Sequence, residues 1–211
     1  MTRRALISFA VVAASIGGLV YAGAFNVAES RVSPGSPAPD FRAVTLDAQP
    51  IAKGIADYRG QVVLLNLWAT WCGPCEWEMP SIQALHDDFS PAGLKVVAVA
   101  VDDPGFEQRV RDFVARKGLT FEILSEGSGK IEADYEARGI PATYLIGRDG
   151  LIRKRVAGAS DWNSPANRAL VAHLLGVDTG GPESSGQRSA ITSNDAPARA
   201  HSPFPIPDSR W

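Results

Sequence analysis

Cysteine is scarce in this chain: only two of its 211 residues are cysteines. A small domain stapled by several disulfides is therefore excluded, and so is a zinc site built from four cysteines. An excess of charge of one sign is also missing, because 21 basic residues stand against 23 acidic residues. Without a basic stripe, the sequence gives no electrostatic case for binding nucleic acid. A fold of this length must rest on a hydrophobic core, and 45% of the residues are hydrophobic.

The two cysteines stand close together, in the run WCGPC at residues 71–75. An apolar run at 62–68 precedes them, and a helix-like segment at 76–89 follows. Two thiols separated by two residues between a strand and a helix are suited to reversible disulfide chemistry. A zinc site would need two more ligands, and the three histidines are scattered along the chain. We therefore expect redox chemistry, with no metal and no bound cofactor.

The N-terminal segment, residues 1–32, has the pattern of an export signal. Arg3 and Arg4 precede an uncharged run from Ala5 to Ala24, which as a helix would span about 30 Å, enough for a bilayer. Positive charge before the run predicts a cytoplasmic N-terminus and an extracytoplasmic domain. The run is longer than the apolar core of a cleaved signal peptide, which favours a membrane anchor. Cleavage near Ala24, giving a soluble periplasmic protein, is the alternative.

Residues 33–178 are predicted to form one α/β domain. Strands are predicted at 62–68, 94–101, 121–124, 142–146 and 151–157, and helices at 76–89, 106–117, 131–135 and 165–175. Loosely alternating residues at 41–46, a turn at 47–49 and a return at Ile51 predict an N-terminal β-hairpin. This order predicts a central mixed β-sheet flanked by helices on both faces. Residues 179–211, rich in Ser, Pro, Ala and Gly, are predicted to be a disordered tail.

Motifs in a fixed order over residues 34–178 resemble those of the thioredoxin superfamily, and within it the extracytoplasmic TlpA/ResA-like group. They are PAPDF at 37–41, YRGQVVLLN at 58–66, WATWCGPC at 68–75, EMP at 78–80 and GIPATYLI at 139–146. The resemblance implies a thioredoxin-like fold and a thiol-disulfide oxidoreductase. It also implies that Cys72 and Cys75 cycle between a dithiol and a disulfide.

The position of each thiol predicts its role. Cys72 should stand just before the helix, where unpaired N–H groups and the helix dipole favour its thiolate. We assign it as the more exposed, nucleophilic thiol, and Cys75 as the resolving thiol. Asn66 occupies the strand position where thioredoxin carries a buried carboxylate. Glu78 lies one helical turn after Cys75, and we hypothesise that it is partly buried, tunes the thiol pKa values and relays a proton. A solvated helix glutamate is the alternative.

Other residues of the site follow from the resemblance. Gly73 and Pro74 form the dipeptide of thioredoxin, which suggests a reducing poise. Pro141 is expected to be cis and to face the disulfide, with Ile140 pairing its backbone with the substrate. Trp71 is expected to cover the sulfurs and to offer apolar contact.

The expected partners are exported proteins that carry disulfides. In the resembling group one recurrent substrate is apocytochrome c, but cytochrome-specific relatives often carry Glu where this chain has Ala142. A membrane electron donor such as a CcdA/DsbD-like transporter is also expected.

Two other interpretations of the function stay open. A peroxiredoxin-like thiol peroxidase usually has a proline seven residues before its cysteine, which is missing here. A non-enzymatic thioredoxin-fold binding module or metallochaperone is the second, although the copper-delivery proteins of this kind use a C-x-x-x-C spacing.

Overall fold

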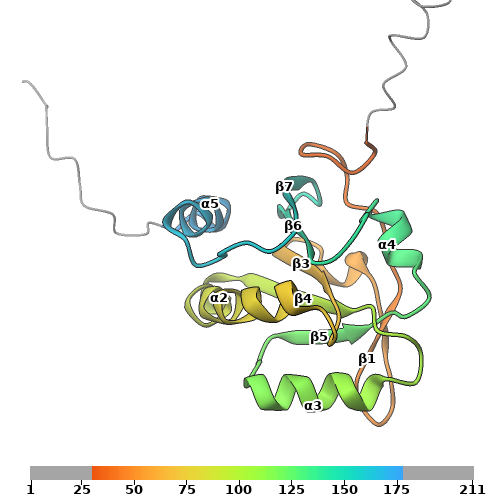
Figure 1. Ribbon diagram of the computed structural model, residues 1–211. Coiled ribbons are helices and arrows are strands. Elements are labelled where there is room, and N and C mark those ends of the chain that lie inside the picture. The colour runs from red at the N-terminus through yellow and green to blue at the C-terminus, as the bar shows by residue number, and fades with distance from the viewer. Residues whose placement is uncertain (1–29, 178–211) are drawn as a thin grey trace, which may run out of the picture. The chain divides into compact units, whose positions relative to one another are not determined.

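Strand β3 (Val62–Trp68) is the centre of the domain in the computed structural model, which describes residues 30–177 (Figure 1). All seven of its residues are buried. It pairs in parallel with β4 (Leu94–Ala100) and antiparallel with β6 (Ala142–Ile146). A continuous apolar run suits this place because the strand is covered on both faces and paired along both edges.

Further strands extend the sheet on both sides, in the order β2-β1-β5-β4-β3-β6-β7. β5 (Glu122–Ser125) lies parallel to β4, and β7 (Ile152–Ala157) lies antiparallel to β6. β1 (Ala43–Thr45) and β2 (Ala52–Lys53) form an antiparallel pair beyond β5. The predicted mixed sheet and its N-terminal hairpin extension are both confirmed.

Helices cover both faces of the sheet, as predicted. α2 (Gly73–Phe89), α3 (Glu107–Lys117) and α5 (Pro165–Leu175) contribute side chains to one core cluster. α4 (Lys130–Asp134) contributes to the other. Figure 1 accordingly shows α2 and α5 on one side of the central strands and α4 on the other.

Side chains along β3 alternate between the two faces of the sheet, so the strand contributes to both core clusters. Leu64 and Trp68 belong to the cluster beneath α2, whereas Leu65 and Leu67 belong to the cluster beneath α4. Because the strand period is two, Asn66 shares the face of Leu64 and Trp68. The central strand therefore presents one fully buried polar side chain toward α2.

Helix α2 begins three residues earlier than predicted. Its first residue is Gly73 rather than Glu76, and Cys72 is its N-cap. Pro74 is compatible with this start because the N–H groups of the first turn have no intrahelical acceptor. The two residues between the cysteines, Gly73 and Pro74, are thus helical, and the N-terminus of α2 lies at the redox pair.

The packed domain begins before residue 33, although we predicted residues 1–32 as anchor and linker. Val32 is fully buried, and its carbonyl accepts a hydrogen bond of 2.9 Å from the Arg155 guanidinium. The predicted membrane span, Ala5 to Ala24, and the predicted tail, 179–211, lie outside the described residues. Across residues 30–177, no helix combines the length and the apolarity needed to cross a bilayer.

Candidate active site

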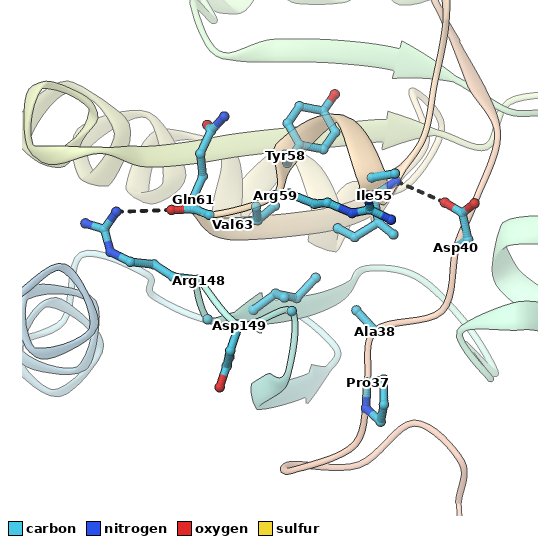
Figure 2. Close-up of a pocket in the computed structure, with 15 residues that line it drawn as sticks. Pro37, Ala38, Asp40, Ile55, Tyr58, Arg59, Gln61, Val63, Arg148 and Asp149 are labelled. Atoms are coloured by element: carbon cyan, nitrogen blue, oxygen red, sulfur yellow. Dashed lines mark hydrogen bonds between the residues drawn. The ribbon is translucent and has the colours of Figure 1, made fainter.

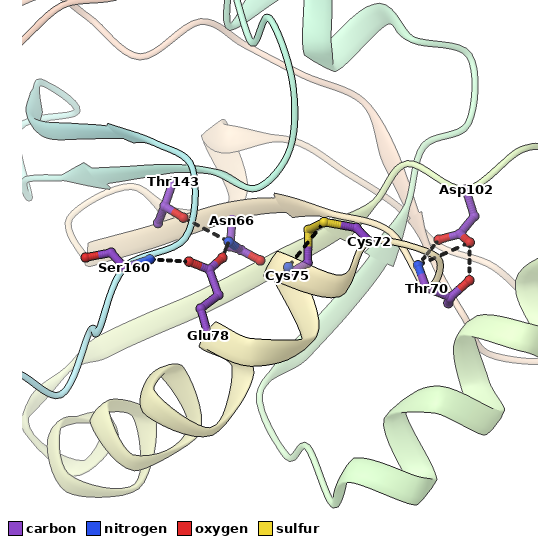
Figure 3. Close-up of a disulfide and its surroundings, with 8 residues drawn as sticks. All are labelled: Asn66, Thr70, Cys72, Cys75, Glu78, Asp102, Thr143 and Ser160. Atoms are coloured by element: carbon purple, nitrogen blue, oxygen red, sulfur yellow. Dashed lines mark hydrogen bonds between the residues drawn. A yellow bond between two sulfur atoms is a disulfide. The ribbon is translucent and has the colours of Figure 1, made fainter.

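The redox pair lies at the junction between β3 and α2. Cys72 is the N-cap residue of α2, and Cys75 lies in its first turn. Their sulfurs form a disulfide, with 5.2 Å between the two Cα atoms (Figure 3). The structure therefore describes the oxidised protein, and the strand-to-helix junction predicted from the sequence is confirmed.

The two sulfurs have different surroundings. Cys72 keeps 6% of its surface exposed, whereas Cys75 is fully buried, so the expectation that Cys72 is the more accessible is confirmed. The backbone N–H of Cys75 also donates a hydrogen bond of 3.2 Å to the Cys72 Sγ. A donor at a helix N-terminus stabilises negative charge on this sulfur. The geometry thus favours a Cys72 thiolate in the reduced protein.

Asp102 anchors the turn that leads into the pair, a role that we did not predict. Its buried carboxylate follows β4 and accepts hydrogen bonds from the Thr70 backbone N–H, at 3.0 Å, and from the Thr70 hydroxyl (Figure 3). A carboxylate directly after a buried strand was the available sequence signal. The anchor fixes the backbone two residues before Cys72.

Glu78 is fully buried, more deeply than the partial burial that we predicted, and the alternative of a solvated helix glutamate is wrong. Its Oε1 accepts a hydrogen bond of 2.7 Å from Asn66 Nδ2, and its Oε2 accepts one of 3.2 Å from the Ser160 backbone N–H. Burial raises the pKa of Glu78 to about 7, against the opposing effect of these hydrogen bonds. A carboxyl with this pKa can accept or release a proton near neutral pH.

Asn66 joins Glu78 to a neighbouring strand. Its Nδ2 also donates a hydrogen bond of 2.8 Å to Thr143 Oγ1 on β6. Figure 3 shows Asn66, Glu78, Thr143 and Ser160 gathered beside Cys75, from four separate parts of the chain. Sequence reasoning missed Thr143 and Ser160 because they lie 77 and 82 residues away from their partners.

The bond between Ile140 and Pro141 is cis, as expected. Pro141 is buried, and Ile140 packs against the core cluster that contains both cysteines. A hollow of about 330 Å³ adjoins this loop. Its lining includes Arg138, Gly139 and Ile140.

Trp71, Gly73 and Pro74 are all exposed around the pair. Trp71 keeps 64% of its surface exposed, so most of its ring is available to a partner. We expected it to cover the sulfurs as well. That part of the expectation stays a prediction.

A separate cavity of about 470 Å³ lies away from this chemistry (Figure 2). Its lining residues come from the N-terminal segment, the turn before β3 and the β6–β7 turn, and they include neither cysteine. Asp40 and Arg148 at its walls bind the backbone, through the Ile55 N–H and the Gly60 carbonyl. Within residues 30–177, no three His, Cys, Asp or Glu side chains gather as a metal site requires.

Known proteins share this sequence pattern. The sequence profile of the AhpC/TSA family matches residues 34–155. The thiol-disulfide oxidoreductase ResA of Geobacillus thermodenitrificans is 37% identical over 145 residues, which cover 69% of this chain and 80% of that protein. The ResA of Bacillus anthracis is 30% identical over 148 residues, covering 70% of this chain and 83% of that protein.

Solved structures share the fold. The Chlorobium tepidum protein assigned as thiol:disulfide interchange protein DsbE has a TM-score of 0.57 and 27% identity, covering 68% of this chain and 96% of that one. StoA from Bacillus subtilis has a TM-score of 0.51 and 27% identity, covering 67% and 98%. The chain belongs to the AhpC/TSA family and, within it, is a thiol-disulfide oxidoreductase of the ResA type.

Proposed function

We propose that this oxidoreductase works as a reductase of disulfides in exported proteins, with Glu78 as the proton acceptor of its resolving thiol. The burial of Glu78 one helical turn from Cys75, with a pKa of about 7, carries the assignment of the proton acceptor. The reducing direction rests on the thioredoxin-type dipeptide Gly73-Pro74.

The cycle begins with the reduced protein. The Cys72 thiolate attacks one sulfur of the substrate disulfide, which forms a mixed disulfide and releases the other substrate sulfur as a thiolate. Cys75 then gives its proton to the Glu78 carboxylate and attacks the Cys72 Sγ. This step forms the Cys72–Cys75 disulfide, breaks the mixed disulfide and releases the second substrate thiolate. Two electrons pass from the protein dithiol to the substrate, whose thiolates take up two protons, one released by Glu78 and one from the solvent.

Substrate docking is assigned to the exposed surface around Cys72. Trp71 offers an apolar face there, and the hollow that adjoins Ile140 is assigned to another side chain of the substrate segment. Ile140 stands directly before the cis Pro141, where an extended substrate segment can pair with the backbone.

The proposed location is the extracytoplasmic side of the cytoplasmic membrane, with the segment from Ala5 to Ala24 as anchor. The charge pattern after Arg3 and Arg4 supports it. Thiols outside the cytoplasm tend to be oxidised, so a reductase there needs electrons from across the membrane. A CcdA/DsbD-like transporter is the proposed donor, and apocytochrome c is one candidate substrate.

Trapping of substrates tests this function. In Cys75→Ser the mixed disulfide at Cys72 cannot be resolved, so partner proteins should accumulate as adducts that dithiothreitol releases. The matched control is the Cys72→Ser/Cys75→Ser protein, which should trap nothing. The proposal fails if the adducts of Cys75→Ser equal those of the control, or if the purified wild type consumes peroxide but leaves insulin disulfides intact.

The role of Glu78 is tested by the pH profile of kcat/KM. The wild type should gain activity as Glu78 ionises near its pKa of about 7, and Glu78→Gln should lose this inflection. Two profiles of identical shape would remove Glu78 from the mechanism while leaving the two cysteines in place.

A further inference from the structure

Among the residues that the structure describes, three buried polar atoms around the active site have no hydrogen-bond partner: Trp68 Nε1, Trp162 Nε1 and Asn66 Oδ1. The Asn66 oxygen is the acceptor among them. Asn66 is fully buried, and its Nδ2 donates both of its protons, to Glu78 Oε1 and to Thr143 Oγ1. Its Oδ1 is buried too, yet it accepts no hydrogen bond from any residue that the structure describes. A buried acceptor left unpaired is costly, so each such atom in a folded protein calls for an explanation.

The orientation of the amide is fixed by its neighbour. With Glu78 ionised, exchanging the two ends would place Oδ1 at 2.7 Å from Glu78 Oε1, and an ionised carboxylate has no proton to donate. In the ionised state the end that faces Glu78 is therefore Nδ2, and Oδ1 points elsewhere.

Figure 3 shows on which side of the amide the free oxygen lies. Figure 3 shows the Asn66 carbonyl oxygen on the side of the amide that faces the first turn of α2, where Cys75 lies. Chain geometry agrees, because Asn66 touches Glu78, and Glu78 lies one helical turn after Cys75 on the buried face of α2. In the oxidised protein the Cys75 sulfur is bonded to Cys72 and has no proton to offer.

We propose that Asn66 is a positioning residue of the resolving step: in the reduced protein its Oδ1 accepts the S–H hydrogen bond of Cys75. One amide then holds the resolving thiol at one end and its proton acceptor at the other. This inference rests on the proposed role of Glu78 and names the group that aligns it with Cys75.

The hydrogen bond that Asn66 donates to Glu78 and the proposed one that it accepts from Cys75 have opposite electrostatic effects. An acceptor against the neutral thiol disfavours the Cys75 thiolate, whereas a donor against Glu78 favours the carboxylate. Asn66 thus keeps the proton on Cys75, with Glu78 ionised and ready to receive it. Asn66 itself exchanges no proton, because its amide is neither a useful acid nor a useful base at neutral pH.

The other charged groups near Asn66 make no hydrogen bond that would oppose its effect on the protons of Cys75 and Glu78. Thr143 on β6 is neutral, and Cys75 and Glu78 are the titratable groups that α2 turns inward. Beyond them, Lys154 on β7 binds Asn167, and Asp161 before α5 is exposed. Neither donates to or accepts from Asn66 or Glu78 in the described part of the chain.

The titration of Cys75 tests the proposal. In the full-length Cys72→Ser protein Cys75 is the single thiol, so its ultraviolet thiolate absorbance reports one group. Adding Asn66→Leu removes the acceptor and should raise the ratio of thiolate to thiol at fixed pH by about threefold to tenfold, the effect of one hydrogen bond. Adding Asn66→Asp keeps an acceptor and adds negative charge, so it should lower the ratio.

Thr143→Val is the matched control, because it removes the other partner of the same Nδ2 without touching Cys75. It should leave the ratio within about twofold of the Cys72→Ser protein. The proposal is overturned if Asn66→Leu and Asn66→Asp shift the ratio in the same direction, or if neither differs from Thr143→Val.

A measurement with Asn66 intact covers the case in which Asn66→Leu does not fold. The S–H stretching band of Cys75 in the Cys72→Ser protein should have the lowered frequency of a hydrogen-bonded thiol, and a free-thiol frequency would overturn the proposal. None of these measurements needs turnover. Failure of the wild type to reduce insulin disulfides would reject the proposed function, and an unchanged Cys75 titration would reject this inference alone.

Discussion

The burial of Glu78 predicts how folding stability depends on pH. The folded protein raises the pKa of this carboxyl from 4.5 to about 7, chiefly because burial removes water from the charged form. A raised carboxyl pKa favours the folded state while the group is protonated. Its contribution is therefore complete below about pH 4.5 and is lost as the pH rises through about 7. At about 1.4 kcal/mol for each pH unit, the full loss comes to about 3.5 kcal/mol, of which about 3 kcal/mol falls between about pH 4.5 and about pH 8.

Glu78→Gln isolates this contribution, because glutamine keeps the shape of the side chain and cannot ionise. Urea unfolding of the oxidised protein at about pH 4.5 and about pH 8 gives the free energy of unfolding at each end of the range. The wild type should lose about 3 kcal/mol more than Glu78→Gln between these two values. Glu76→Gln is the control, since Glu76 lies on the same helix but is exposed, and it should follow the wild type.

The reasoning would be refuted by parallel curves for the wild type and Glu78→Gln. It would be refuted equally by a Glu78→Gln protein whose advantage grows toward acid, because that sign requires a lowered pKa. A loss of stability common to all pH values would indicate only a broken hydrogen bond with Asn66.

Three more predictions concern the surroundings of the pair. Trp71→Ala should leave the free energy of unfolding within about 0.5 kcal/mol of the wild type but lower kcat/KM several-fold for a protein disulfide, and not for a small disulfide, in parallel assays. Asp102→Ala should cost about 1–3 kcal/mol of stability in urea unfolding and slow the alkylation of reduced Cys72, because the Thr70 backbone N–H loses its acceptor. Glu122→Gln should destabilise the protein by about 1 kcal/mol at neutral pH. It should cause no loss in acid, because burial raises the pKa of Glu122 but the bonds with Lys53 and Lys95 outweigh it and lower that pKa.

The regular core of this fold could be predicted from local pattern. The bounds of β3, β6 and α5 agree with the prediction. Continuous apolar runs are a strong signal for buried strands, and a proline at the start of a helix with a glycine after its end is a strong signal for the helix bounds. The hairpin of β1 and β2 was placed only approximately. Its strands are two and three residues long and carry little periodicity.

The residues of the candidate site also fall into those that local sequence motifs predicted and those that they missed. The cysteine pair and the cis proline lie in motifs of consecutive residues, so the sequence was enough to find them. Asp102, Thr143 and Ser160 were missed because each reaches the site from a distant segment. Glu78 had a sequence signal for full burial, since it shares the helix face of Cys75 and Ile82. That pattern outweighs the usual exposure of helix glutamates.

The choice of an amide at position 66 follows from the place of the carboxylate. Glu78 already supplies one buried negative charge at 2.7 Å from Asn66 Nδ2. A second carboxylate on β3 at that distance would force the two groups to share a proton, and one of them would then be unable to accept another near neutral pH. An amide avoids this conflict and gives Glu78 a donor. The carboxylate on α2 and the amide on β3 therefore act as one unit, and only the helix side of that unit needs to titrate for Cys75 to lose its proton.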